Sequence, residues 1–84
     1  MDKVEQVIRG FIVDNFLFGD TGRMPPNEDS LLERGIVDST GVLELVFYLE
    51  ETYGIAIDTT ELVPANLDSV SRAAGFIRRK IAAR

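Results

Sequence analysis

Apolar residues with the spacing of helices fill most of this 84-residue chain, and almost none of it has the alternation of a strand. Apolar positions at i, i+3, i+4 and i+7 recur over residues 4–18, 39–53 and 70–81, which gives each run one apolar face. The longest strand-like stretch is residues 55–57. A chain of this length can bury only one small core. The sequence therefore predicts an all-α fold.

The connecting segments complete a small four-helix bundle. Residues 19–29 read GDTGRMPPNED, a composition typical of a long surface loop after the first helix. Residues 30–33, SLLE, fit a capping box, which predicts a single helical turn. Residues 59–63 have room for only a short helix, because Pro64 stops it. We therefore expect three longer helices and one short helix in a single domain that spans residues 1–84.

The chain contains neither cysteine nor histidine. It lacks the thiol nucleophile, the usual general base and the soft ligands of a metal site, so we expect neither an enzyme nor a metal-binding protein. The N-terminus has no uninterrupted apolar run, and no segment approaches the ~20 apolar residues of a membrane span. These absences predict a cytoplasmic protein that does not enter a membrane.

The net charge of −5 is unevenly distributed. Residues 28–68 carry ten acidic side chains and one arginine, whereas residues 69–84 carry five basic side chains and no acid. An acidic middle repels nucleic acid and attracts basic protein surfaces, although an uneven solvated surface needs no partner. We expect the basic C-terminal side chains to complement a helix dipole rather than bind nucleic acid. These side chains include Arg78, Arg79, Lys80 and Arg84.

Two Asp-Ser pairs precede expected helices, Asp38-Ser39 and Asp68-Ser69. Aspartate and serine are favoured N-caps worth ~1 kcal/mol, so capping alone explains both pairs, and Ser69 is interpreted as a cap. Ser39, however, follows a long loop and begins an acidic helix. Its hydroxyl would stand at the positive end of the helix dipole, where backbone N–H groups can receive a phosphate. Gly41 leaves this first turn unobstructed. No base lies near Ser39 in sequence, so a partner would have to catalyse any modification.

Three stretches resemble the acyl carrier proteins: residues 28–39, EDSLLERGIVDS; residues 42–46, VLELV; and residues 49–55, LEETYGI. The resemblance covers nearly the whole chain, including the order of the four helices. It implies that Ser39 carries a 4′-phosphopantetheine arm through a phosphodiester, which would supply the thiol that the chain lacks. It also implies that Asp38 lies at the metal-dependent site of a phosphopantetheinyl transferase.

The resemblance further implies that acidic side chains of the second helix meet basic surfaces of partner enzymes, because electrostatic steering suits a carrier that visits several enzymes. These acidic side chains are Glu44, Glu50 and Glu51. The expected partners are the transferase, a ligase that loads an acyl or aminoacyl group, and acyl-transferring enzymes; the carrier itself is expected to be a monomer. Residues 47–48 and the apolar residues around 55–57 are expected in the core rather than in a groove for an acyl chain.

One residue departs from the family pattern. Acyl carrier proteins usually have leucine directly after the modified serine, where this chain has Thr40. A polar residue there weakens an apolar contact with partner enzymes, which indicates a specialised acyl, aminoacyl or polyketide-type pathway rather than housekeeping fatty acid synthesis. The initial Met and the short length favour a stand-alone carrier over a piece of a synthase. The alternative is a carrier-like helical module that is never modified and acts only by binding.

Overall fold

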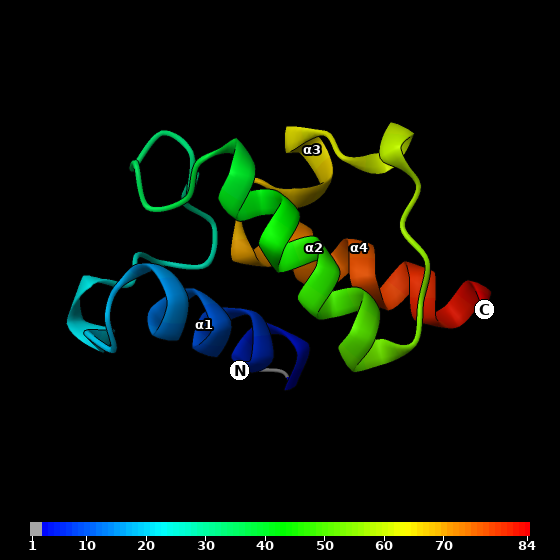
Figure 1. The fold of residues 1–84 in the computed structure, drawn as a ribbon, viewed down its shortest axis with the longest axis horizontal. Coiled ribbons are helices and arrows are strands. Elements are labelled where there is room, and N and C mark those ends of the chain that lie inside the picture. The colour runs from blue at the N-terminus through cyan, green and yellow to red at the C-terminus, as the bar shows by residue number, and fades with distance from the viewer. Residues whose placement is uncertain (1–2) are drawn as a thin grey trace.

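The computed structural model describes residues 3–84, which form four α-helices and two 3₁₀ turns joined by loops (Figure 1). The helices are α1 (Lys3–Phe16), α2 (Ser39–Tyr53), α3 (Pro64–Leu67) and α4 (Val70–Ala83), and the 3₁₀ turns are η1 (Thr21–Arg23) and η2 (Thr59–Glu61). No strand forms in this part of the chain. The predicted all-α fold with three longer helices and one short helix is confirmed. None of the helices within residues 3–84 combines the length and the apolar character that crossing a membrane requires.

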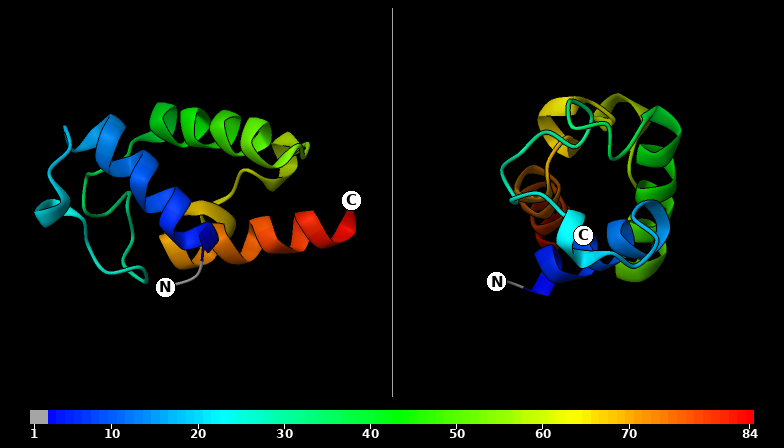
Figure 2. Two further views of the ribbon diagram at one scale, coloured as in Figure 1. Left: turned by 90° about the horizontal axis from the view of Figure 1, so that it is seen from below. Right: turned by 90° about the vertical axis from the view of Figure 1, so that its left-hand side faces the viewer.

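Helix α4 provides most of the helix packing, because it lies against both α1 and α3, while α2 contacts α1. Helices α2 and α4 run along opposite sides of the bundle, as the left view in Figure 2 shows. The expected apolar stripe of α4 is buried, including two alanines whose small side chains allow close approach. Its fully buried members are Val70, Ala73, Ala74 and Ile77. The rest of the core is Ile8, Ile12, Val13, Leu17, Leu31, Val37, Leu45, Val46, Leu49, Leu67 and Phe76.

The long loop between α1 and α2 is held against two helices. Nη1 of Arg9 in α1 donates hydrogen bonds to the carbonyl of Pro25 at 2.9 Å and to Oδ1 of Asn27 at 2.7 Å. The N–H of Ser71 in α4 donates to the carbonyl of Asn27 at 3.0 Å. The predicted loop is therefore confirmed, and its middle is pinned between α1 and α4.

Asp68, at the junction of α3 and α4, holds the second half of this loop. Its Oδ2 accepts the hydroxyl of Ser30 at 2.5 Å, and its Oδ1 accepts the N–H of Leu32 at 3.0 Å. Oγ of Ser30 in turn accepts the N–H of Glu33 at 3.0 Å, which is the serine half of the expected capping box. The segment forms hydrogen-bonded turns rather than a helix.

Two boundaries differ from the expectation. Helix α1 ends at Phe16, and the chain then turns through Phe18 and Gly19, whose φ angles are 54° and 82°. Phe18 therefore leaves the apolar face and is 91% exposed. Residues 59–61 form the 3₁₀ turn η2, and Pro64 begins α3 instead of ending a helix, because proline has no N–H to satisfy at the first helical position.

Candidate functional site

Helix α2 begins with a turn that Asp38 caps. The backbone of Asp38 is extended, with φ −100° and ψ −176°, and its Oδ1 accepts the N–H of Gly41 at 2.7 Å. Its carbonyl accepts the N–H of Val42 at 2.9 Å. At the other end, Gly54 adopts a left-handed conformation with φ 63° and donates its N–H to the carbonyl of Glu50. Both ends of this 15-residue helix are therefore satisfied as the sequence predicts.

Ser39 is the first residue of α2, and its side chain takes no part in the cap. The side chain is exposed, and within residues 3–84 its hydroxyl has no hydrogen-bond partner. Ser69 is different: it is 2% exposed, and its Oγ accepts the N–H of Arg72 at 3.1 Å as the N-cap of α4. The interpretation of Ser69 as a cap is confirmed. At the first Asp-Ser pair the aspartate caps, which leaves the serine hydroxyl available.

Gly41 brings the first turn of α2 close to the core. A Cβ at this position would lie 2.8 Å from Cε1 of Phe16 and 2.9 Å from Cγ1 of Val37. Protein cores are packed too densely to take up such contacts without movement. The space beside Gly41, which we expected to be open, is therefore filled by core side chains. This close packing positions the turn that presents Ser39.

An open and mainly apolar groove of about 320 Å³ lies beside Ser39, between the start of α2 and the segment that contains α3. Only Ser39 and Asp68 contribute polar side chains to its lining. The other lining residues are Leu32, Val42, Leu43, Leu62, Val63, Pro64 and Leu67. This groove could not be predicted from the sequence, because no local signal shows that residues 62–67 pack opposite the first turns of α2.

Thr40 lies on another side of the same turn. It is exposed and lines a second, more polar hollow of about 370 Å³, together with Asn15 and Phe16 of α1 and Glu44 of α2. Successive helical residues are about 100° apart around the axis, so Ser39 and Thr40 face different surfaces although they are adjacent.

The three glutamates expected to meet partners do not share one environment. Glu44 and Glu51 are exposed. Glu50 is half-buried, and its Oε2 accepts the N–H of Ile57 at 2.8 Å. Glu50 is therefore less available to a partner than Glu44 and Glu51, because its carboxylate is occupied by the backbone that follows the helix.

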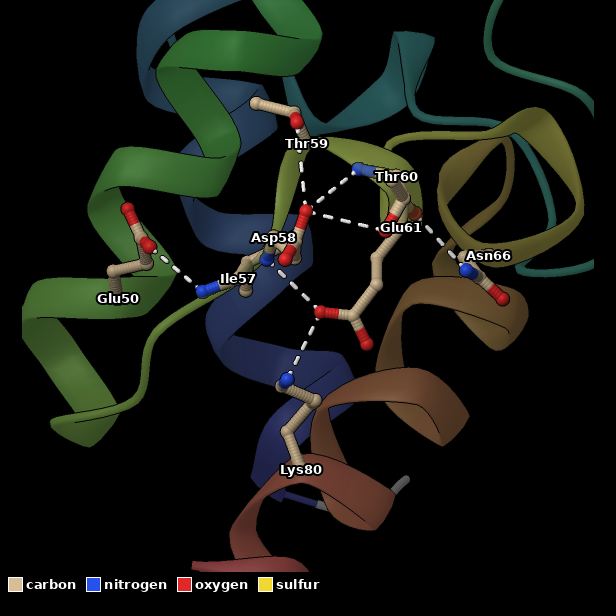
Figure 3. A network of polar contacts seen from close by, with 8 residues as sticks. All are labelled: Glu50, Ile57, Asp58, Thr59, Thr60, Glu61, Asn66 and Lys80. Atoms are coloured by element: carbon tan, nitrogen blue, oxygen red, sulfur yellow. Dashed lines mark hydrogen bonds and ion pairs between the residues drawn. The ribbon is translucent and has the colours of Figure 1, made fainter.

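This contact belongs to a polar network around η2, which Figure 3 shows. Oε1 of Glu61 accepts the N–H of Asp58 at 2.9 Å and forms an ion pair with Nζ of Lys80 in α4 at 2.9 Å. The N–H of Asp58 and then the ammonium of Lys80 hold the pKa of Glu61 below its ordinary value. The N–H and the hydroxyl of Thr60 lower the pKa of Asp58 in the same way. The network connects the segment before α3 to α2 and α4.

Two basic side chains near the C-terminus serve the fold. Lys80 pairs with Glu61, and Nη1 of Arg84 donates a hydrogen bond to the carbonyl of Tyr53. Both contacts reach other elements, η2 and the end of α2, and the expected complement to the helix dipole stays a prediction.

The aromatic residues of α2 also depart from the expectation. Phe47 is 63% exposed, so its placement in the core was wrong. Tyr48 is 37% exposed, and its ring stacks on that of Phe11 in α1 with centroids 4.5 Å apart. Ile55 and Ile57 are half-buried against the core, as expected.

Comparison with known proteins supports a carrier. No family model matches the chain. The D-alanyl carrier protein of Abiotrophia defectiva is 30% identical over 54 residues, which cover 64% of this chain and 68% of that protein. The chain therefore belongs to the family of small carrier proteins. Carrier proteins are not enzymes but act with partner enzymes, so the prediction that the chain is not an enzyme is confirmed by this relationship.

Proposed function

We propose that the chain carries an acyl or aminoacyl group as a thioester on a 4′-phosphopantetheine arm attached to Ser39. The observation that carries this proposal is the division of roles at the start of α2: Asp38 caps the helix, and the exposed hydroxyl of Ser39 has no partner within residues 3–84. A phosphodiester at Ser39 would stand at the positive end of α2, which favours negative charge.

The residues around Ser39 fit the group. When bound, it supplies a thiol at the end of a flexible arm, and a chain without cysteine needs such a thiol to hold a thioester. Asp38 presents its carboxylate beside the attachment point, where we assign it to the metal-dependent site of the transferase. The groove beside Ser39 offers apolar surface on which a cargo can rest.

We assign the carrier to a specialised pathway and treat residues 1–84 as one carrier domain. Thr40 stands where acyl carrier proteins usually have leucine, and it faces a polar hollow. The name of the relative makes an aminoacyl cargo one candidate, and the apolar groove makes an acyl chain the other. The partners are a phosphopantetheinyl transferase, a loading ligase and acyl-transferring enzymes.

Incubation with coenzyme A, Mg²⁺ and a broad-specificity transferase tests the attachment site. Intact mass should increase by one phosphopantetheine in the wild type and not in Ser39→Ala, and the melting temperature of Ser39→Ala should stay unchanged. Ser69→Ala is the matched control: it should lose stability by ~1 kcal/mol as a cap is removed, yet still be modified at a temperature where it is folded.

Labelling that survives Ser39→Ala would refute the assignment. A wild-type protein that never gains mass, even when coexpressed with a transferase, would favour the alternative of an unmodified interaction module. If the wild type does gain mass, the intact mass of the protein from its native host would identify the cargo.

A further inference from the structure

The turn that follows α1 holds a phenylalanine in a conformation that suits glycine. Phe18 has a φ angle of 54°, in the left-handed region, where a side chain crowds the backbone. The side chain is also 91% exposed, so burial does not offset this strain. Residues in strained conformations gather at functional sites, where their surroundings hold them in place. Folding alone therefore does not account for a phenylalanine at this position.

The backbone on both sides of Phe18 is fixed by the fold. The N–H groups of Leu17 and Gly19 both donate to the carbonyl of Val13, at 3.2 and 2.9 Å. The N–H of Asp20 donates to the carbonyl of Leu17 at 2.9 Å, and the side chain of Leu17 is buried in the core. The turn therefore presents the ring at a defined place, which lowers the cost of ordering it in a complex.

This turn lies at the end of the bundle where α2 begins (Figure 1). The ring of Phe16 fills the space beside Gly41, 2.8 Å from where a Cβ would stand. Phe18 follows that ring by two residues, and Ser39 precedes the glycine by two. Since consecutive Cα atoms are about 3.8 Å apart, the Cα atoms of Phe18 and Ser39 are separated by no more than about 25 Å. A protein interface of ordinary size covers about 800 Å² on each partner, a patch about 30 Å across, so an enzyme that acts on Ser39 from the α1 side can cover Phe18 as well.

Phe18 is the large apolar side chain that this side of the molecule exposes. The hollow that Thr40 lines is mainly polar, with Asn15 and Glu44 in its wall. The other large apolar side chains that are exposed within residues 3–84 line the groove or belong to α2; they are Leu32, Leu43, Phe47, Tyr48 and Val63. An apolar contact on the α1 side of Ser39 therefore has to use Phe18.

The charges next to Phe18 indicate the chemistry of its partner. Residues 10–22 carry two acidic side chains, Asp14 and Asp20, and no basic one. Both are exposed, and Oδ1 of Asp20 accepts the N–H of Gly22 at 3.0 Å, which fixes its position. An exposed ring between two carboxylates is complementary to an apolar pocket with basic side chains at its rim.

We propose that the enzyme that modifies Ser39 takes the ring of Phe18 into an apolar pocket beside lysine or arginine side chains. This inference rests on the proposed function, since it needs an enzyme that comes to Ser39. The contact comes from the turn after α1 and is separate from the acidic side chains of α2. The ring stabilises the complex, because buried aromatic groups contribute most to the energetics of an interface.

The experiment measures kcat/KM for modification of Ser39 by a broad-specificity phosphopantetheinyl transferase with coenzyme A and Mg²⁺. Phe18→Ala should lower kcat/KM about tenfold, mainly through KM, because the buried ring is lost. Phe18→Leu should keep most of the wild-type value, because an apolar side chain can still enter the pocket. Thr21→Ala, at an exposed position three residues further along the chain, is the control and should keep wild-type kinetics.

Phe18→Gly separates binding from stability. This substitution removes the ring and also the strain, because glycine adopts a positive φ angle without crowding. Its melting temperature should therefore rise by a few degrees above that of the wild type, while its kcat/KM falls as in Phe18→Ala. A loss of kcat/KM in a protein more stable than the wild type cannot come from unfolding.

Three outcomes would overturn the inference while leaving the proposed function intact. The first is wild-type kcat/KM in Phe18→Ala when the wild-type protein is modified normally. The second is a melting temperature of Phe18→Gly below that of the wild type, since the ring would then serve the fold. The third is a wild-type dimer in sedimentation that Phe18→Ala dissociates, which would assign the ring to a second copy of the chain. If the wild type itself gains no mass, the proposed function fails, and this inference fails with it.

Discussion

The carboxylate of Asp38 accepts the N–H of Gly41 at 2.7 Å, so the residue before Ser39 and the residue two positions after it close the first turn of α2. The side chain of Ser39 lies outside this contact. Asp38 therefore combines a structural role that the geometry shows with the role toward a transferase that we propose for it.

Substitutions of Asp38 should separate these two roles. Asp38→Asn keeps a side-chain oxygen for the N–H of Gly41, so its free energy of unfolding should stay close to that of the wild type, whereas Asp38→Ala should lose ~1 kcal/mol. Both variants should be modified more slowly by the transferase, because both lack the carboxylate. Urea unfolding and the rate of mass gain measure the two effects. If Asp38→Asn were modified at the wild-type rate, the role of Asp38 would be restricted to capping.

Gly41→Ala should destabilise the protein by about 1–3 kcal/mol, because the added methyl group overlaps Phe16 and Val37 in a packed region. Gly10→Ala is the matched control: a Cβ there meets nothing within 4 Å, and alanine in the interior of α1 should stabilise by roughly 0.5–1 kcal/mol. Urea unfolding followed by circular dichroism gives both values. If both substitutions changed the free energy of unfolding in the same direction, the result would contradict the packing contact at Gly41.

Glu61 should titrate below its ordinary pKa of 4.5, because the N–H of Asp58 and then the ammonium of Lys80 stabilise its charged form. A lowered pKa in the folded state means that these contacts stabilise the fold above pH 4.5 and that this contribution is lost as the pH falls through the folded pKa. Lys80→Gln should raise the pKa of Glu61 only part of the way, because the N–H of Asp58 remains. NMR titration of the Glu61 carboxyl carbon tests this. An identical pKa in both proteins would show that the ion pair does not form in solution.

Thr40→Leu should improve modification by a transferase from fatty acid synthesis. Burying the Thr40 hydroxyl unpaired against an apolar pocket costs about 1–3 kcal/mol, which corresponds to roughly tenfold to hundredfold in kcat/KM. The same substitution should weaken charging by the enzyme of the carrier's own pathway, provided that this enzyme contacts the hydroxyl. Thr21→Leu, at an exposed position in η1, is the control. If kcat/KM stayed unchanged with both enzymes, the main support for a specialised pathway would be lost.

The longer helices could be predicted because their signals are local. Asp38 and Gly54 stand directly beside the apolar pattern of α2, and Ser69 stands beside that of α4, so start and stop residues agree with the periodicity. Pro64 shows the limit of local signals. Proline both disrupts the interior of a helix and suits its first position, and neighbouring residues do not decide between these outcomes.

Exposure on α2 could not be predicted from periodicity alone. The pattern allowed Phe47 a place on the apolar face, but the fold buries the face that carries Leu45 and Leu49 and leaves Phe47 outside. The groove beside Ser39 depends on where Leu62 and Leu67 pack, which is a long-range contact. The exposure of Phe47 and the groove beside Ser39 thus both arise from tertiary packing.

The free hydroxyl of Ser39 also bears on what selection can act upon at this position. Helix α2 is capped by its neighbour, and the core nearby is filled by Phe16 and Val37 around Gly41, so folding places no demand on an oxygen atom at residue 39. A chain with alanine there would fold, pack and resist unfolding like the wild type. Any pressure that retains serine at this position must therefore come from chemistry outside the folded chain, such as the attachment that we propose, and a copy that lost the serine would persist as an intact protein without that attachment point.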